Sequence, residues 1–355
     1  MADVRPFRAV RYARPSASVT APPYDVIDEP AREELAARDP HNVVRLTLEP
    51  DEDVAAERLN AWLADGTLVR DDEPAAWWLE QDATGPDGVA RTREGIVASL
   101  RAEPYSTGAV LPHERTHRGP IEGRLRLLRA TRTQLESIFL LFEGAAPATR
   151  PDRAPDVDVG EARLWRLAGD EGIAAFFAGR QLLIADGHHR YETAVAFAGE
   201  TGADRLPVVL VSTADPGLAV FPTHRVFAGR PEIDPPGELF DSLDEALAAL
   251  GRAAPHDPVA LFFRQGEARV VRAADGELDV DLVEQFGHDG LSYTPDRAEA
   301  ERRVRSGAAD CTFLLRPPRI EDVFERAREG RPMPPKTTYF APKLLSGLLF
   351  QPVDQ

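Results

Sequence analysis

The chain has 355 residues, of which 43% are hydrophobic, and this length predicts a large buried core with two or three subdomains. Its formal net charge of -17 argues against a general affinity for nucleic acid, which needs basic residues to neutralise phosphates. The N-terminus lacks an apolar signal core and no apolar run approaches the roughly 18 residues of a membrane span. We therefore expect a soluble, cytoplasmic protein with no membrane partner.

Apolar runs and helical periodicity alternate along the chain and predict a mixed α/β fold with multi-stranded mixed sheets. We expect helices over residues 30–38, 52–64, 120–132, 187–199 and 318–329. Strands are expected over residues 43–48, 76–80, 95–100, 137–142, 182–185, 206–212, 259–263 and 312–315. Residues 144–160, rich in Ala, Pro and Asp, are the expected linker, with a second break near 231–236. The predicted regions are therefore 1–143, 161–230 and 231–355.

The N-terminal segment begins with a stiff turn. Pro22 and Pro23 force an extended or turn conformation, which places Tyr24 and Asp25 on a rigid loop as candidate site residues. An ordinary turn would explain the same residues. The segment that follows, residues 40–48, is expected to form a loop and then a strand.

Arginine is concentrated between residues 115 and 132, where six arginines accompany one acid, Glu122. Part of this run fits the exposed face of a helix, with a buried stripe of Ile121, Leu125 and Leu128. Five polar residues precede that helix, and they offer donors for a polyanion and a carboxylate that could act as a base or a metal ligand: His113, Glu114, Arg115, Thr116 and His117. A charged surface loop is the alternative interpretation.

The segment 181–194 predicts a strand, a tight turn and a helix start. Its apolar run stops at Asp186 and Gly187, in the positions of an N-cap and a sharp bend, and a buried helical face of Tyr191, Ala194, Val195 and Ala198 follows. The first turn of the helix carries His188, His189 and Arg190. Free amides and the helix dipole favour an anion at such a position, so a bound phosphate is the natural hypothesis, although ligand-free turns of this kind are common.

The C-terminal half contributes two further clusters. His224 and Arg225 lie between aromatic residues and are either site residues or a satisfied core pair. The only two lysines, Lys336 and Lys343, both lie in residues 333–343, which indicates a requirement for a compact ammonium, more for Lys336 than for Lys343. The single cysteine, Cys311, excludes an internal disulfide, and its apolar setting predicts a core strand. No phosphate-loop, dinucleotide-binding or His-Glu-x-x-His motif is present.

Six motifs together resemble the bacterial and archaeal family catalogued as domain of unknown function 1015, in order from residue 3 to about residue 350. They are Pro22-Pro-Tyr-Asp-Val-Ile, His41-Asn-Val-Val-Arg-Leu, Leu111-Pro-His-Glu-Arg-Thr, Ala185-Asp-Gly-His-His-Arg-Tyr-Glu-Thr-Ala, Pro222-Thr-His-Arg and Met333-Pro-Pro-Lys-Thr-Thr-Tyr-Phe-Ala-Pro-Lys. The chain departs from the family pattern at Ile121, where lysine is usual, and at Gly123, where aspartate is usual. These departures put any charged pair beside Glu122 in doubt.

The Asp186-Gly-His-His-Arg segment also resembles the Gly-x-x-Arg box of the ParB and sulfiredoxin superfamily, whose members bind CTP, ATP or ADP, and it is similar to a segment of free-serine kinases. The resemblance implies a ParB/sulfiredoxin-like nucleotide-binding element within residues 161–230. It implies that Gly187 cradles phosphate, that Arg190 with His188 or His189 stabilises charge, and that Asp186 positions Mg²⁺ or orients a histidine. The remaining expected roles are base or metal ligand for Glu114 and base for Asp25, phosphate binding for His113, Arg115, Arg124, Lys336 and Thr337, and substrate binding for Tyr24, His224, Arg225 and Tyr339.

The leading hypothesis is a nucleotide-dependent kinase that phosphorylates a small hydroxylated metabolite, serine or a serine-like acid, with ATP, ADP or CTP and Mg²⁺ as cofactors. Phosphoryl transfer needs chiefly positioning and charge neutralisation, which these residues can supply. The alternatives are a metal-dependent phosphatase of small phosphorylated metabolites and a non-catalytic nucleotide-binding regulator. We expect a small-molecule substrate and no nucleic-acid partner, with a homodimer as the assembly to consider.

Overall fold

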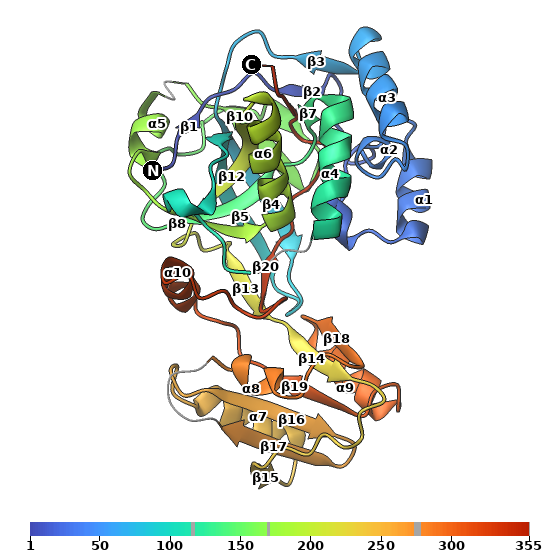
Figure 1. The fold of residues 1–355 in the computed structure, drawn as a ribbon, viewed down its shortest axis with the longest axis vertical. Helices are drawn as coiled ribbons and strands as arrows, with labels where there is room; N and C mark the ends of the chain where they lie inside the picture. The colour runs from blue at the N-terminus through green and yellow to red at the C-terminus, as the bar shows by residue number, and fades with distance from the viewer. Residues whose placement is uncertain (115–117, 169–170, 273–277, 355) are drawn as a thin grey trace. The chain divides into compact units, whose positions relative to one another are not determined.

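The computed structural model describes residues 1–114, 118–168, 171–272 and 278–354 (Figure 1). The chain divides into two compact units, each described here by itself. Unit 1 comprises residues 1–83, 90–218 and 342–355, and unit 2 comprises residues 84–89 and 219–341. Residues 144–160, predicted as a linker, lie inside unit 1, where Val157–Asp158 forms strand β9. Unit 1 is therefore discontinuous in sequence and is completed by the C-terminal 14 residues.

Unit 1 is built on a nine-stranded mixed sheet with the strand order β6-β11-β8-β12-β5-β4-β10-β9, and β1 also pairs with β5. β11 runs parallel to β6 and β12 runs parallel to β8, whereas the other pairs are antiparallel. The strands are β1 (Val4–Arg5), β4 (Trp77–Thr84), β5 (Ala90–Arg101), β6 (Val110–Leu111), β8 (Ile138–Phe142), β9, β10 (Ala162–Arg166), β11 (Leu182–Asp186) and β12 (Arg205–Ser212). The central strands are buried on both faces, which explains their nearly continuous apolar sequences.

The remaining elements of unit 1 are helices and two short sheets, β2 (Val10–Tyr12) with β3 (Leu68–Arg70) and β7 (Thr133–Gln134) with β21 (Gln351–Pro352). The helices are η1 (Tyr24–Val26), α1 (Glu29–Arg38), α2 (Val44–Thr47), α3 (Glu52–Ala64), η2 (Tyr105–Thr107), α4 (Arg118–Thr131), α5 (Glu171–Phe177) and α6 (His188–Thr201). α4 packs against both α6 and α3 (Figure 1). Leu125 and Leu128 on α4 meet Phe197 on α6, which confirms these two members of the predicted apolar stripe, whereas Ile121 is half-buried.

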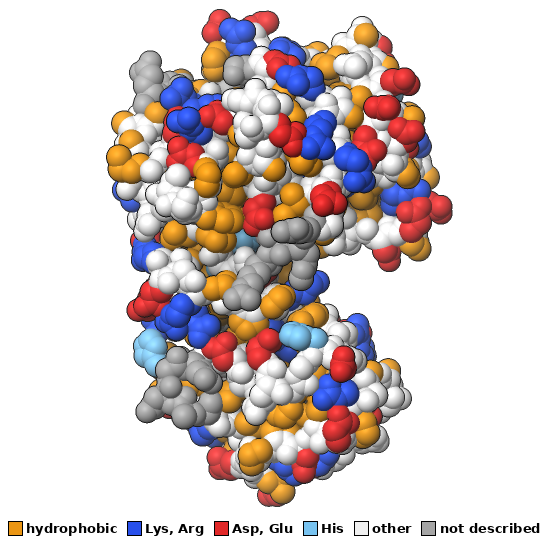
Figure 2. Space-filling view, in the orientation of Figure 1, with side chains coloured by type: hydrophobic (Ala, Val, Ile, Leu, Met, Phe, Trp, Pro, Cys, Tyr) orange, Lys and Arg blue, Asp and Glu red, His pale blue; other side chains and the backbone are white. Residues whose placement is uncertain are grey.

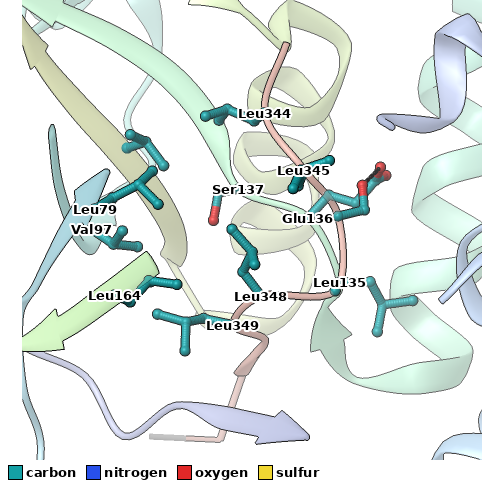
Figure 3. Close-up of a pocket in the computed structure, with 13 residues that line it drawn as sticks. Leu79, Val97, Leu135, Glu136, Ser137, Leu164, Leu344, Leu345, Leu348 and Leu349 are labelled. Atoms are coloured by element: carbon teal, nitrogen blue, oxygen red, sulfur yellow. Dashed lines mark hydrogen bonds between the residues drawn. The ribbon is translucent and has the colours of Figure 1, made fainter. Parts of the chain in front are cut away.

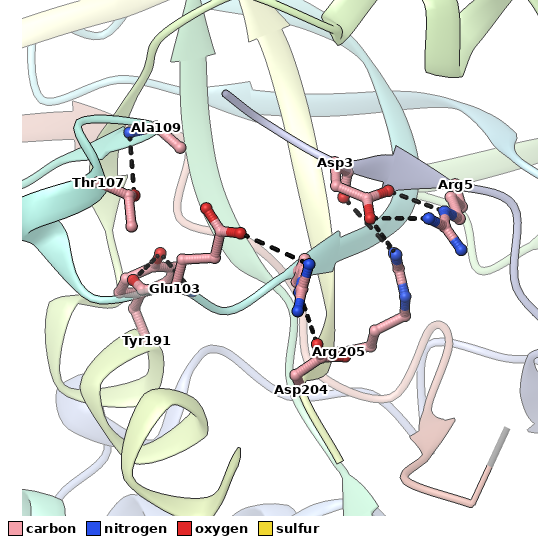
Figure 4. Close-up of polar contacts among 9 residues, drawn as sticks. Asp3, Arg5, Glu103, Thr107, Ala109, Tyr191, Asp204 and Arg205 are labelled. Carbon is pink, nitrogen blue, oxygen red and sulfur yellow. Dashed lines mark hydrogen bonds and ion pairs between the residues drawn. The ribbon is translucent and has the colours of Figure 1, made fainter. Parts of the chain in front are cut away.

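Polar contacts fix the first turn of α6 and one end of the sheet (Figure 4). The Tyr191 hydroxyl donates to the Glu103 carbonyl at 2.7 Å and accepts from the Glu103 amide at 3.2 Å. Arg205 donates to Asp3 at 2.7 Å, which ties β12 to the residue before β1. The start of α6 is therefore held against the rest of unit 1 by both apolar and polar contacts.

Unit 2 contains a six-stranded antiparallel sheet with the order β15-β17-β16-β19-β14-β18 and a separate pair, β13 with β20. Its strands are β13 (Ala219–Pro222), β14 (His224–Phe227), β15 (Glu238–Phe240), β16 (Val259–Arg264), β17 (Glu267–Arg272), β18 (Leu291–Thr294), β19 (Cys311–Leu314) and β20 (Thr338–Ala341). Its helices are α7 (Leu243–Arg252), α8 (Asp281–Glu284), α9 (Arg297–Arg305) and α10 (Ile320–Arg328). Two apolar clusters form its core, and Cys311 is buried in one of them, as predicted.

The mixed α/β class is confirmed, but one predicted strand is wrong. Residues 43–48 were expected to form a strand, and the structure has α2 there. Asn42 explains the difference, because its side chain accepts from the Val44 amide at 3.1 Å and donates to the carbonyls of Ser18 and Thr20 at 2.7 and 2.9 Å. These buried hydrogen bonds of the Asn42 side chain thus outweigh the strand preference of two consecutive valines.

Figure 2 shows acidic and basic side chains interspersed over the visible face of the molecule. In the described parts of the chain, no helix combines the length and the apolar character needed to cross a bilayer.

Candidate functional site

The turn between β11 and α6 requires glycine at its centre. Gly187 has φ 100°, in the left-handed region, and a Cβ there would lie 2.7 Å from Cγ2 of Ile138 and 3.1 Å from Nη2 of Arg190. Asp186 does not cap the helix as predicted, since Gly187 holds the N-cap position without a side-chain bond. Asp186 instead ends β11, with its carboxylate free to pair with other groups.

Asp186 is buried between two cations. One carboxylate oxygen accepts from Nη2 of Arg190 at 2.7 Å, and the other pairs with the ammonium of Lys343. Burial opposes ionisation of Asp186, but the charges of Lys343 and Arg190 outweigh burial and hold the pKa of Asp186 well below its usual range. Arg190 also donates to the Ser137 carbonyl at 2.6 Å, which fixes its guanidinium beside the turn. The start of α6 therefore carries a fixed charge cluster, of which Lys343 is a member.

Two histidines and Glu114 extend this cluster. Nδ1 of His113 lies 2.7 Å from the Ile184 carbonyl, and the His113 amide donates to Nε2 of His188 at 3.4 Å. Burial and the neighbouring His113 lower the pKa of His188 to about 3, so this imidazole is neutral at pH 7. Glu114 lies 3.5 Å from His113, and although burial opposes ionisation, His113, His188 and Lys343 lower its pKa to about 2. The positive charge at this turn thus comes from Arg190 and Lys343 rather than from His188.

A second buried carboxylate, Glu136, joins the N-terminal loop to the cluster. One oxygen of Glu136 accepts from the Tyr24 amide at 3.2 Å and from the Ser346 hydroxyl at 2.8 Å. Arg124 lies 3.7 Å from the other oxygen and stacks over the Tyr24 ring at 3.9 Å. A cavity of about 30 Å³ is lined by Arg124, Glu136 and Arg190, among others. These contacts bring the predicted residues Tyr24, Arg124 and Arg190 into one neighbourhood of unit 1.

Asp25 is an exposed carboxylate of this region. Partial desolvation raises the pKa of Asp25, and the negative charge of Asp186 raises it further, against the opposing charges of Arg190 and Lys343. A raised pKa makes Asp25 a stronger base than an ordinary surface aspartate. Asp25 therefore differs from Glu114 and Asp186, whose pKa values are lowered.

Arg93 and Gln81 hold the chain that carries Lys343. The fully buried Arg93 donates to the Pro342 carbonyl and, at 2.9 Å, to the side chain of Gln81. Gln81 in turn donates to the Lys343 carbonyl at 2.6 Å. Burial lowers the pKa of Arg93 to about 9, which leaves it charged at pH 7. Strands β4 and β5 thereby fix the backbone from which the Lys343 side chain reaches Asp186.

The segment after Lys343 passes beside Glu136 and Ser137 (Figure 3). A cavity of about 10 Å³ lies there, lined mainly by leucines that include Leu344, Leu348 and Leu349. This volume is at the lower limit for one water molecule, so the cavity is a packing gap of the core. The apolar residues 344–349 anchor the segment, while Ser346 supplies its polar contact to Glu136.

Not all predicted site residues lie in unit 1. Asp25, Glu114, Asp186, His188 and Arg190 contribute to the cluster, whereas Arg115, Thr116 and His117 fall outside the described residues. His189 lies on α6, and its carbonyl accepts from the Thr193 hydroxyl at 2.8 Å. Tyr24, His113, Arg124 and Gly187 also lie in unit 1, whereas five predicted residues belong to unit 2: His224, Arg225, Lys336, Thr337 and Tyr339.

Arg225 and His224 maintain the internal structure of unit 2. The guanidinium of Arg225 is fully buried and donates to the carbonyls of Thr223, Pro335 and Lys336, the last at 3.0 Å. Nδ1 of His224 accepts from the Leu315 amide at 3.2 Å, and burial lowers the pKa of His224 to about 4. These contacts match the interpretation of His224 and Arg225 as a satisfied core pair.

The described residues do not fit a protein-held metal. Among them, no three His, Cys, Asp or Glu side chains gather in a way that could hold an ion. One carboxylate oxygen of Asp186 contacts Arg190 and the other contacts Lys343, and its expected roles toward a metal or a histidine stay predictions. We therefore assign no step to a metal held by Asp186 and Glu114.

Comparison with known proteins identifies the family. The model of the family described as "Protein of unknown function (DUF1015)" matches residues 4–290, and the chain belongs to this family. No curated protein sequence is significantly similar to the chain.

Several solved structures align with the chain over most of their own length. A conserved hypothetical protein from Pyrococcus furiosus is 18% identical, with a TM-score of 0.39, and the alignment covers 69% of this chain and 93% of that one. A free serine kinase in complex with AMP is 17% identical, with a TM-score of 0.40 and coverages of 68% and 88%. SbnI from Staphylococcus aureus, with a C-terminal truncation, is 13% identical, with a TM-score of 0.43 and coverages of 70% and 85%. Because these TM-scores lie below 0.5, we base the proposed function on the site itself.

Proposed function

We propose that the unit 1 cluster is the phosphate end of a nucleotide site, and that the protein is a phosphotransferase acting on a small hydroxylated metabolite. The observation that supports this most is that Asp25, an exposed carboxylate of raised pKa, feels the charges of Arg190 and Lys343, which Asp186 holds at the start of α6. Phosphoryl transfer needs a base for the acceptor hydroxyl and positive charge for the phosphoryl oxygens. This cluster offers both groups.

The proposed reaction moves the terminal phosphoryl group of the nucleotide to the acceptor. The acceptor oxygen forms the new P–O bond while the bond to the leaving nucleotide breaks, and the hydroxyl proton passes to Asp25. Lys343, Arg190 and the first-turn amides of α6 neutralise charge on the phosphate oxygens. Asp186 holds the two cations in place in the absence of ligand.

The experiment is a direct assay with the purified protein. ATP, ADP or CTP is supplied with Mg²⁺ and a panel of hydroxylated acids, and ³¹P NMR follows formation of a phosphomonoester. Serine heads the panel, because the Asp186-Gly-His-His-Arg segment resembles one in free-serine kinases. We expect Asp25→Asn to lower kcat by roughly 10²- to 10⁴-fold while leaving nucleotide affinity nearly unchanged, as for loss of a general base.

Two inactivating variants and one control variant test whether turnover in that assay depends on the unit 1 cluster. Asp186→Ala and Arg190→Ala should abolish turnover because they dismantle the phosphate end, and Arg129→Ala, on the exposed face of α4, should retain it. Release of inorganic phosphate from a small phosphorylated metabolite, with no nucleotide present, would identify the phosphatase alternative. Stoichiometric nucleotide binding without turnover would identify the regulator, and a wild-type protein that neither binds nor consumes any nucleotide would refute the proposal.

A further inference from the structure

Unit 2 contains a large cavity of its own. Its volume is about 600 Å³, within the range of roughly 300–1,000 Å³ that is typical of small-molecule sites. The end of α7, the loop after it, the turn after β19 and α10 form its walls. Thr337, from the lysine-containing segment 333–343, also lines it.

The walls combine apolar and cationic groups. Leucine, valine and proline side chains form the apolar part, and four arginines face three carboxylates among the charged lining residues, in a chain whose net charge is -17. The arginines are Arg316, Arg319, Arg326 and Arg331, and the carboxylates are Asp279, Asp322 and Glu325. Each of these arginines is also paired with an acid: Arg316 with Asp279, Arg319 with Glu321, Arg326 with Asp281 and Arg331 with Glu329. The four guanidinium groups of this large cavity offer N–H donors to an anionic ligand.

Arg316 fixes the shape of the cavity. Its Nε and Nη2 donate to Asp279, each at 2.8 Å, and its Nη1 donates to the Ala254 carbonyl at 2.9 Å. Nη2 also donates to the Asp257 carbonyl at 2.7 Å. These bonds tie the loop after α7 to the turn after β19. The cavity wall is thus preorganised, which lowers the cost of binding.

Arg319 and Arg326 are placed to meet a ligand. Nη1 of Arg319 lies 2.9 Å from Nε2 of His256, and the side chain of Arg319 is 40% exposed. Arg326 is held by its ion pair with Asp281, and its side chain is 14% exposed. A guanidinium presents a planar fork of donors that matches a carboxylate or a phosphate. The apolar wall beside these forks suits a ligand with a hydrophobic body.

We propose that this cavity is a second binding site, contained in unit 2, for a small organic anion with an apolar body and a carboxylate or phosphate group. Arg319 and Arg326 bind the anionic group, and the apolar wall, which is rich in proline, packs against the body. The site is independent of the phosphotransferase site proposed for unit 1.

Calorimetric titration of the full-length protein tests this site with four probes: benzoate, phenyl phosphate, inorganic phosphate and the neutral benzyl alcohol. We expect benzoate or phenyl phosphate to bind with a stoichiometry of one at this cavity, and at least 10-fold more tightly than benzyl alcohol. Comparison of benzoate with phenyl phosphate distinguishes the carboxylate from the phosphate. If phenyl phosphate binds more tightly than inorganic phosphate, the difference in affinity measures the contribution of the apolar wall.

Three variants locate the binding. Gly251 lines the cavity, and a Cβ there meets no atom within 4 Å, so Gly251→Trp can fill the cavity without a backbone clash. This variant and Arg319→Gln should each weaken binding at least 10-fold, whereas Arg305→Gln, an exposed change on α9, should not alter it. Asp186→Ala should retain the unit 2 binding, which separates it from phosphate binding in unit 1. The proposal is overturned if neither benzoate nor phenyl phosphate binds to the wild-type protein. It is also overturned if Gly251→Trp binds the anion as tightly as wild type does.

Discussion

Lys343 is bound to a buried carboxylate, and its removal would leave the negative charge of Asp186 with one fewer partner. Breaking a buried pair costs about 3–5 kcal/mol, and the 20% exposure of Lys343 reduces that figure, so we expect Lys343→Met to destabilise unit 1 by about 1–3 kcal/mol. All four tryptophans, Trp62, Trp77, Trp78 and Trp165, lie in unit 1, so urea unfolding followed by tryptophan fluorescence measures this loss.

The matched control for that loss is Arg129→Ala, which removes an exposed ion pair with Glu200 and should leave the free energy of unfolding nearly unchanged. Equal stability of Lys343→Met and wild type would show that the pair with Asp186 does not form.

His188 predicts a dependence of stability on pH. Its pKa is lowered from 6.5 to about 3, so between these values the unfolded chain binds a proton that the folded chain does not. Stability therefore falls as the pH is lowered through this window, by about 1.3 kcal/mol between pH 7 and pH 5.5 for one such group. His188→Gln should lose less stability than wild type over the same interval in the tryptophan-monitored assay. Parallel losses in the two proteins would contradict a neutral, buried His188.

The sequence could identify some site residues but not their partners. Asp186, Gly187 and Arg190 follow from a strand, turn and helix pattern that is local in sequence. Arg93 and Gln81 could not be found in this way, because the pairing of β4 with β5 and the return of residues 342–343 bring them together. Glu136 was missed for the same reason, since its partners come from residues 24 and 346.

At the scale of elements, the start of α6 depends on a residue without a side chain. Gly187→Ala would combine a left-handed backbone with a Cβ 2.7 Å from Ile138, so we expect a loss of about 2–3 kcal/mol in unit 1 together with weaker nucleotide binding. The stability assay is again tryptophan-monitored urea unfolding.

Gly199 offers the matched control on the same helix. It is exposed, and a Cβ there meets nothing within 4 Å, so Gly199→Ala should be neutral or stabilise by up to about 1 kcal/mol. If both alanine variants behaved alike, the left-handed turn at Gly187 would not be the conformation in solution.

Most long elements could be predicted because their apolar periodicity is local and strong. α3, α4, α6 and α10 begin and end within a few residues of the predicted helices. α2 could not be predicted, because its start depends on contacts of Asn42 with residues 18 and 20. Tertiary hydrogen bonds therefore determine that residues 44–47 form a helix, whereas local propensity is enough to predict the other elements.

At the scale of the whole chain, unit 2 has its own apolar core, formed by residues that follow Leu218 in sequence. We expect a fragment of residues 219–341 to unfold cooperatively on heating when followed by circular dichroism. By contrast, removal of residues 342–355 should disrupt unit 1, because it deletes Lys343, β21 and the contact of Ser346 with Glu136. A fragment without a cooperative transition would show that unit 2 depends on the rest of the chain.

The most direct test of the proposed phosphotransferase is the ³¹P NMR assay of nucleotide with serine and related hydroxylated acids. Wild type should convert a nucleotide and an acceptor into a phosphomonoester, Asp186→Ala should form none, and Arg129→Ala should match wild type. A wild-type protein that neither binds nor consumes ATP, ADP or CTP would contradict the account.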